Sequence, residues 1–181
     1  MQSGIKIIAM KSSYIITALL LTAVLSNAQT KTNNGMDRIQ QIEDNLALKE
    51  LVDTFSNLSD VKDVSSQVLL FTEDATVQTF ANGNRVANLK GRKAMENAFA
   101  PFLSRFETVY HFNGQHTVKL DGNNATGVLY CTVTLIGMQD GKRMKTTIGV
   151  SYNDEYVRQN DKWFIANRKS HFNWQDSEEI N

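Results

Sequence analysis

The strongest constraint in this chain is a series of long, alternating apolar segments in its second half. Four such segments cover residues 107–120, 125–138, 142–157 and 162–174, and short polar turns separate them. Two of the three turns contain an Asp-Gly pair, which is a strong signal for a β-hairpin, and the third is the polar stretch RQNDK. Each segment is roughly twice as long as an ordinary strand, so we expect the strands to bend at bulges. The pattern predicts an antiparallel meander that forms a strongly curved sheet.

The first half of the chain predicts helical segments and one hairpin. Apolar residues recur at helical spacing over residues 37–58, and a second short helix is expected to start near residues 59–61. Residues 91–106 predict a third helix, and residues 75–89 predict a hairpin around an Asn-Gly turn. Helical segments combined with a long curved sheet indicate an α+β fold, in which helices pack on one face and leave an open pocket.

The N-terminal residues have the pattern of an export signal. Lys11 precedes an apolar run, residues 14–25, and small residues follow at the spacing that a signal peptidase reads. The run is shorter than the roughly 20 residues that a membrane-spanning helix needs, and a buried N-terminal helix is the alternative. We therefore expect an exported protein, periplasmic or secreted. The predicted organisation is a signal peptide at residues 1–28, a flexible tether at 29–36, a single domain at 37–176 and a C-terminal tail at 177–181.

Charge and cysteine content exclude several classes of partner. The chain has 19 basic and 19 acidic residues, and residues 1–28 hold two of the basic ones and no acid, which leaves a net charge of −2. That balance gives no electrostatic footprint for nucleic acid or for an anionic membrane, and no stable membrane span is expected after signal removal. Cys131 is the only cysteine, so no internal disulfide forms; its apolar neighbours indicate a buried residue.

Several stretches together resemble the SnoaL-like branch of the nuclear transport factor 2-like superfamily. They are LKELVDTFSNLSDVKDVSSQVLLFTEDATV, LKGRKAMENAF, VYHFNGQHTVKLDGNNATGVLYC and DKWFIANRKSHFNW, within residues 37–175. The resemblance implies a cystatin-like cone, with three N-terminal helical segments packed on a strongly curved, mostly antiparallel sheet around a pocket. It also implies a small, fairly apolar ligand or substrate, no cofactor, and a homodimer across the outer sheet face. The superfamily includes dehydratases, isomerases, cyclases and non-enzymes, so fold alone does not set the function.

Two residues match the catalytic positions of scytalone dehydratase-like members of this superfamily. Asp60 and His111 stand where a carboxylate and an imidazole work as a pair, and such a pair can transfer a proton near neutral pH. Two alternatives remain open, His111 as a buried structural histidine and Asp60 as the N-cap of the second helix. The second histidine of the dehydratase has no counterpart in residues 131–137. The tyrosine and aspartate of ketosteroid isomerase are replaced by Phe55 and Thr79.

Other residues are candidates for contacting a ligand. A tyrosine in the middle of a strand can present its phenol to a substrate, or it can pack its ring and turn the hydroxyl to water. Arg168 has the fork geometry that binds a carboxylate, and a surface ion pair is its alternative role. The candidate substrate-binding residues are Tyr130, Tyr152, Arg168 and Phe55.

No metal site is expected from the sequence. His111 and His116 differ in strand parity, so on a regular strand their rings face opposite sides, although a bulge at Gly114 would change this. We therefore predict an exported domain that binds a small apolar molecule, as a cofactor-independent lyase, isomerase or cyclase with a His–Asp pair. A non-catalytic ligand-binding module of the same fold is the alternative.

Overall fold

The computed structural model describes residues 37–181, so the expected signal peptide and tether lie outside the described residues. Of the described residues, 37–44 fall in one unit and Asn45–Asn181 form a second unit, which contains the sheet. In the part of the chain that the structure describes, no helix has the length and apolar character required to cross a membrane.

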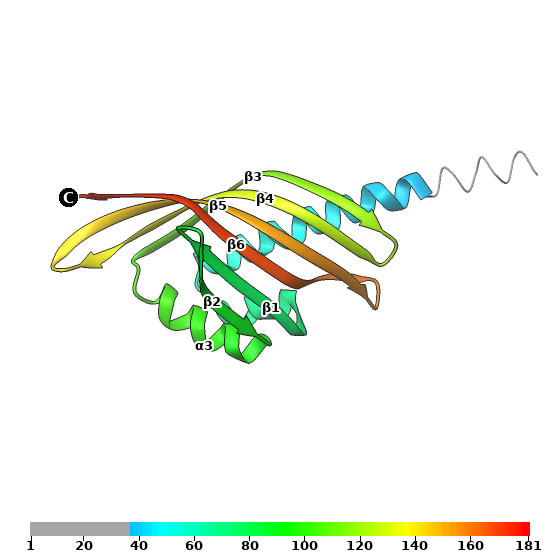
Figure 1. Cartoon of the computed structure of the whole chain (residues 1–181), viewed down its shortest axis with the longest axis horizontal. Coiled ribbons are helices and arrows are strands. Elements are labelled where there is room, and N and C mark those ends of the chain that lie inside the picture. The colour runs from blue at the N-terminus through cyan, green and yellow to red at the C-terminus, as the bar shows by residue number, and fades with distance from the viewer. Residues whose placement is uncertain (1–36) are drawn as a thin grey trace, which may run out of the picture. The chain divides into compact units, whose positions relative to one another are not determined.

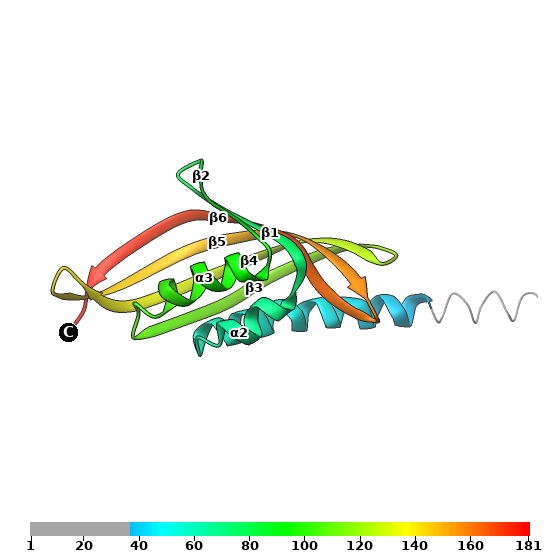
Figure 2. The same cartoon turned by 90° about the horizontal axis from the view of Figure 1, so that it is seen from below.

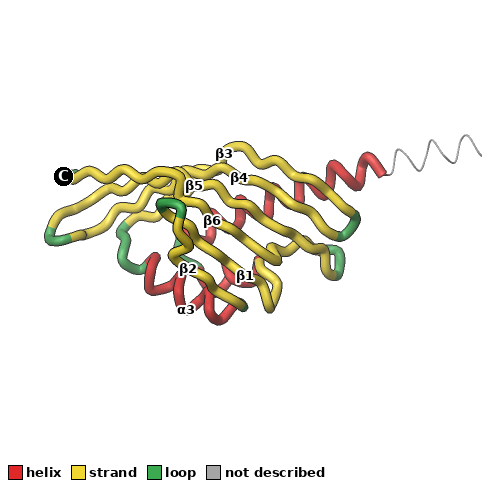
Figure 3. The backbone as a smooth tube through the Cα atoms, viewed as in Figure 1, coloured by secondary structure: helices red, strands yellow, loops and turns green. Residues whose placement is uncertain are grey.

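Helices and strands follow one another with short connections (Figures 1 and 3). A helix covers residues 37–60; α2 (Val64–Gln67) then continues into the 3-10 helix η1 (Val68–Leu70), and α3 spans Arg92–Leu103. The strands are β1 (Phe71–Ala81), β2 (Asn84–Lys90), β3 (Thr108–Asp121), β4 (Asn124–Gln139), β5 (Lys142–Gln159) and β6 (Lys162–Glu179).

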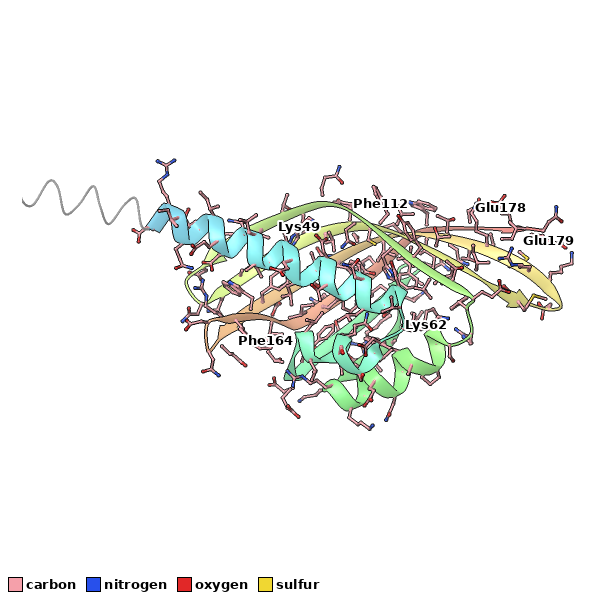
Figure 4. The ribbon with its side chains drawn as sticks, turned by 180° about the vertical axis from the view of Figure 1, so that it is seen from behind. Lys49, Lys62, Phe112, Phe164, Glu178 and Glu179 are labelled. Carbon is pink, nitrogen blue, oxygen red and sulfur yellow. The ribbon has the colours of Figure 1, made fainter. Side chains whose placement is uncertain are left out.

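The six strands form one open sheet in the order β2-β1-β6-β5-β4-β3. Neighbours are antiparallel, except β1 and β6, which are parallel. The predicted hairpin, the meander and the α+β fold class are confirmed, but the sheet does not close into a barrel. Residues 177–179, expected in a C-terminal tail, pair with β5 as the end of β6, where Figure 4 shows Glu178 and Glu179.

Helices α2 and α3 lie on one face of the sheet, which curves over them (Figure 2). The core lies between these layers and includes the buried side of the first helix. That side presents Leu48, Leu51, Val52 and Phe55, each at most 8% exposed. Leu46, an apolar residue of the helical pattern in residues 37–58, is instead 65% exposed, because Leu48 and Val52 face the core in its place.

The first helix ends at Asp60, and a different acid starts the next helix. Lys62 has a φ of 61°, a left-handed conformation that commonly terminates helices. The carboxylate of Asp63 then caps α2 by accepting the backbone N–H of Ser66 at 3.1 Å. The alternative role of Asp60 as this N-cap is therefore wrong. Asp60 is the last residue of the first helix, and Asp63 is the N-cap of α2.

Helix α3 ends against β4 at a close contact that requires glycine. The helix ends at Leu103, with Pro101 in its last turn, and is shorter than predicted. The turn that follows lies against Gly137. A Cβ atom on Gly137 would stand 2.9 Å from the carbonyl oxygen of Arg105 and 3.2 Å from the Cα atom of Phe106. Backbone would have to move to admit any larger residue here.

Replacing Gly137 by alanine should lower the free energy of unfolding by about 1–3 kcal/mol, because the added methyl group overpacks against backbone. Gly114→Ala is the matched control, since the nearest atom to a Cβ there is a carbonyl oxygen at 3.4 Å, an ordinary contact. Urea denaturation measures both variants. Equal stability of the two would contradict the close approach at Gly137.

Candidate functional site

A largely apolar cavity of about 320 Å³ lies between the helices and the sheet, and we call it the central cavity. The first helix, α2, α3 and the strands all contribute lining residues, so the helical layer and the sheet are both needed to form it. Its apolar lining includes Phe55 from the first helix and Phe99 from α3. The polar and charged lining residues are Ser59, Gln67, Thr79, His111, Tyr152, Arg168 and Ser170.

His111 lines this cavity and is held by Asp60 through two hydrogen bonds. The Nδ1 atom of His111 lies 2.7 Å from Oδ1 of Asp60, and the backbone N–H of His111 donates to Oδ2 at 3.2 Å. The imidazole side chain is 7% exposed and the carboxylate 22% exposed. Asp60 and His111, which the resemblance predicted to act as a pair, are therefore in contact, although they are 51 residues apart in the sequence.

The contact determines which ring nitrogen of neutral His111 carries the proton. A carboxylate only accepts hydrogen bonds, so Nδ1 must carry the hydrogen that lies between it and Asp60. The lone pair of the neutral ring is then on Nε2. Among the described residues, Nε2 of His111 has no hydrogen-bond partner, so it is available to a bound molecule.

A second set of hydrogen bonds fixes β3 against the first helix two residues further along. Asn113 donates from Nδ2 to Oδ1 of Asp53 at 3.0 Å and accepts from the hydroxyl of Ser56 at 3.1 Å. Asn113 shares strand parity with His111, so both side chains face the helix. These bonds restrain the position of the imidazole relative to the cavity.

Arg168 lines the cavity and forms a buried ion pair. Its Nε donates to Oδ1 of Asp154 at 2.8 Å and its Nη2 donates to Oδ2 at 2.6 Å. Burial alone would lower the pKa of Arg168, but the paired carboxylate raises it above its ordinary value, so the guanidinium stays charged. The alternative role of Arg168 in a surface ion pair is wrong, because both side chains are at most 1% exposed.

One nitrogen of the Arg168 guanidinium makes no hydrogen bond to the part of the chain that the structure describes. This nitrogen, Nη1, is buried and has no hydrogen-bond partner among the described residues. The Oε1 atom of Gln67, another lining residue, is also buried and also lacks a hydrogen-bond partner there. The guanidinium carbon lies 4.3 Å from the ring centre of Phe55 and 4.4 Å from that of Tyr152. The aromatic rings hold the cation by cation–π attraction, while the cavity wall retains one unpaired donor and one unpaired acceptor.

The ion pair continues into a hydrogen-bonded chain that ends at His116. The hydroxyl of Tyr156 donates to Oδ2 of Asp154 at 2.9 Å and lies 3.1 Å from Nε2 of His116. Because a phenol has one proton, Nε2 of His116 must donate to the Tyr156 oxygen. The register of β3 shifts between Asn113 and His116, so this bulge turns His116 to the inner face. The regular-strand prediction, with His111 and His116 on opposite faces, is therefore wrong.

The two candidate tyrosines lie on opposite faces of the sheet. Tyr152 and Phe55 both line the central cavity, and burial raises the pKa of the Tyr152 phenol. Tyr130 is 54% exposed and is not a lining residue of the cavity. Strand alternation explains this, because its neighbours Leu129 and Cys131 point inward.

Some functional candidates were missed by the sequence reasoning. Asp154 and Tyr156 share strand parity with Tyr152. The alternation of apolar and polar residues in β5 therefore could have predicted that Asp154 faces the interior. Gln67 gave no signal in the sequence. Burial raises the pKa of Cys131 to about 12, so this thiol stays protonated. In the described residues, no group of three or more His, Cys, Asp or Glu side chains is arranged to hold a metal ion.

Replacing Asp154 by asparagine should lower the free energy of unfolding by about 3–5 kcal/mol, because a buried guanidinium loses its counter-charge. The matched control is Lys93→Gln, which removes the exposed Lys93–Glu96 pair and should cost less than about 1 kcal/mol. Urea denaturation at neutral pH gives both values. Similar losses in the two variants would contradict a buried, fully desolvated pair.

Stability should also depend on the titration of His116. Burial lowers the pKa of His116 and outweighs the attraction of Asp154, which acts in the opposite direction. Below about pH 6.5 the unfolded chain therefore binds a proton at this site that the folded chain does not. The free energy of unfolding should accordingly decrease as the pH is lowered from 7 to 5. His116→Gln should flatten this dependence in urea denaturation between pH 7 and 5. Parallel profiles of the parent and variant would contradict the shift.

Comparison with known proteins identifies the family and the fold. The sequence matches the SnoaL-like domain over residues 40–169. An uncharacterized protein of Mycobacterium tuberculosis (strain ATCC 25618 / H37Rv) is 25% identical over 137 residues, which are 75% of this chain and 90% of the relative.

Solved structures share the same architecture at low sequence identity. A candidate scytalone dehydratase from Novosphingobium aromaticivorans aligns with a TM-score of 0.68 and 15% identity over 78% of this chain and 91% of the other. A hexachlorocyclohexane dehydrochlorinase (LinA, type 2) aligns with a TM-score of 0.65 and 12% identity, over 78% of this chain and 91% of the other. An NTF2-like protein with a cystatin-like fold from Novosphingobium aromaticivorans aligns with a TM-score of 0.61 and 21% identity, over 78% of this chain and 89% of the other. These likenesses show the fold, and the match over residues 40–169 shows that the chain belongs to the SnoaL-like domain family.

Proposed function

We propose that the protein is a cofactor-independent lyase or isomerase that removes a proton from a carbon atom of a small, largely apolar molecule. The observation that carries this proposal is the 2.7 Å contact between Asp60 and the Nδ1 atom of His111 in the wall of the central cavity. A carboxylate behind an imidazole, with the other ring nitrogen free, is the arrangement of a general base with its orienting group.

In the proposed step, Nε2 of His111 accepts the proton from the substrate carbon. Asp60 then faces an imidazolium ion through the Nδ1–H bond and stabilises the new positive charge. The apolar lining excludes water, which would otherwise compete for hydrogen bonds with the reacting groups. Asp60 itself does not need to take up a proton in this step.

Loss of the proton leaves negative charge on the substrate, and the same cavity contains groups that can stabilise it. The guanidinium of Arg168 and the phenol of Tyr152 both line the cavity. Because Arg168 retains one unpaired donor, Nη1, we propose that it donates to the oxygen or leaving group on which charge develops. The raised pKa of Tyr152 makes its phenol a hydrogen-bond donor rather than a proton source at neutral pH.

The names of two structural neighbours support a lyase-type reaction. A candidate scytalone dehydratase and a hexachlorocyclohexane dehydrochlorinase are named for removing water and hydrogen chloride from their substrates. Their fold similarity makes a related elimination or isomerisation the first activity to test here.

A non-catalytic binding module is the second candidate, and one observation favours it. Residues 131–137, where the dehydratase resemblance implies a second histidine, contribute only apolar side chains to the cavity, Val133 and Leu135. A cavity with fewer titratable groups is better suited to holding an apolar molecule unchanged.

The proposal can be tested without the natural substrate by following proton removal from neutral ketones. Cyclohexanone and 2-tetralone are incubated with the protein in deuterated water, and NMR measures deuterium uptake at the α-carbon. His111→Gln should reduce the protein-dependent rate by about 10²- to 10⁴-fold, and Asp60→Asn should reduce it as well. His171→Gln is the control, because His171 lies outside the cavity lining and stacks on Phe80.

Two results would contradict catalysis. If His111→Gln and His171→Gln exchange the probes equally, the imidazole is not the base. If the ketones bind, as calorimetry would show, and no exchange occurs above the buffer rate, the binding-module alternative is favoured.

A further inference from the structure

A second hollow adjoins the central cavity and shares part of its wall. This outer chamber has a volume of about 380 Å³. Four side chains line both spaces, Phe102 from α3 and Leu135, Ile148 and Phe172 from the sheet. The two spaces are therefore adjacent, with these four side chains between them, and a ligand that occupied both would have to pass these side chains.

The shared wall is apolar throughout. Leu135 and Ile148 are buried, whereas Phe102 is 39% exposed and packs edge-on against Phe106, with ring centres 5.3 Å apart. Apolar groups of a ligand crossing this wall would lose contact with water, and each buried methylene group adds about 0.8 kcal/mol of binding free energy. The crossing region therefore suits an aliphatic or aromatic part of a ligand.

The outer chamber contains a cation that has no carboxylate partner. Arg105 lines the chamber, and no Asp or Glu of residues 37–181 forms an ion pair with it. The closest acid in sequence, Glu107, accepts from Arg143 at 2.8 Å instead. The Arg105 guanidinium lies 4.8 Å from the ring centre of Phe102, at the side of the shared wall. An anion placed here would meet an available positive charge.

The backbone that carries Arg105 is held in place from two sides. Its carbonyl oxygen lies against Gly137, and the backbone N–H of Glu107 donates to the carbonyl of Ile136 at 2.7 Å. The side chain of Lys62 donates to the carbonyl of Phe106, and Figure 4 shows Lys62 between the first helix and α3. The backbone position from which the exposed Arg105 side chain reaches the chamber is therefore set by the fold.

The central cavity, unlike the outer chamber, offers no unbalanced positive charge among its described lining residues. The positive charge of Arg168 is already balanced by Asp154 at 2.8 and 2.6 Å, and Asp60 lies behind His111. A ligand carboxylate there would add a buried negative charge next to two others, which is unfavourable. A neutral acceptor such as a carbonyl oxygen avoids this cost and still accepts from Nη1 of Arg168.

The geometry points to an elongated, amphipathic anion as the ligand of this protein. A neutral carbonyl-type group lies in the central cavity, an apolar body crosses the shared wall, and a terminal carboxylate meets Arg105 in the outer chamber. This assignment rests on the proposed function for the reacting end of the molecule, but the outer chamber and Arg105 define the other end independently.

The test uses ω-oxo-ω-phenylalkanoates, with a ketone at one end and a carboxylate at the other. Acids with chains of four to ten carbons are compared with their uncharged primary amides by isothermal titration calorimetry. Affinity should rise up to about fourfold per added methylene while the chain fills the shared wall. The longer acids should bind about fivefold more tightly than their amides, the upper range for an exposed ion pair.

Arg105→Gln should remove the preference for the acid over the amide, and Arg85→Gln should not, because Arg85 is an exposed arginine on β2 outside both chambers. Equal binding of acids and amides in the parent, equal effects of the two variants, or affinity independent of chain length would each overturn the proposal. Because the readout is binding, an Arg105-dependent preference without deuterium exchange would reject the proposed catalysis and keep this ligand class.

Discussion

The bond between Asp60 and His111 connects the architecture of the protein to its chemistry. One carboxylate, on the last residue of the first helix, binds both the ring and the backbone of a residue on β3. Without this bond the helix would lose part of its attachment to the edge strand of the sheet, and the cavity would lose part of one wall. The same bond selects the imidazole tautomer. The attachment of β3 and the orientation of the imidazole therefore both depend on one partly buried carboxylate, and the cost of its partial desolvation is offset by the two donors of His111.

Charge in the interior is arranged so that little of it is uncompensated. Arg168 and Asp154 neutralise each other, the phenol of Tyr156 gives a third donor to that carboxylate, and aromatic rings cover the guanidinium. A buried pair of this kind contributes little net stability, but removing either partner is costly. Its value in this fold is positional, because the bidentate contact fixes the one guanidinium nitrogen that remains without a partner.

The sequence predicted the secondary structure of this protein better than the orientation of its side chains. Asp-Gly turns and alternation located the long strands, because both signals are local. Gly114 marked a possible bulge, but whether β3 bulges there and turns His116 inward is decided by its pairing with β4. The same limit applies to Arg168: an arginine on a strand predicts surface exposure unless its partner is known. That partner, Asp154, was visible only as an acid at an inward-facing position of β5, and Tyr130 was misplaced because strand parity was not applied to it.

The composition of the cavity wall limits which reactions are plausible for this chain. His111 is the only imidazole in the lining among the described residues, and burial keeps the phenol of Tyr152, another lining residue, protonated. A dehydration that uses two separate groups needs an acid besides His111 for the departing hydroxide, and the described lining residues include no second histidine. An isomerisation needs none, because the same Nε2 can return the proton that it removed. An elimination whose leaving group departs as a stable anion also needs none, since the anion requires only a donor such as Nη1 of Arg168. The proposed chemistry is therefore best matched by these two reaction types, in which one base and one fixed cation are sufficient.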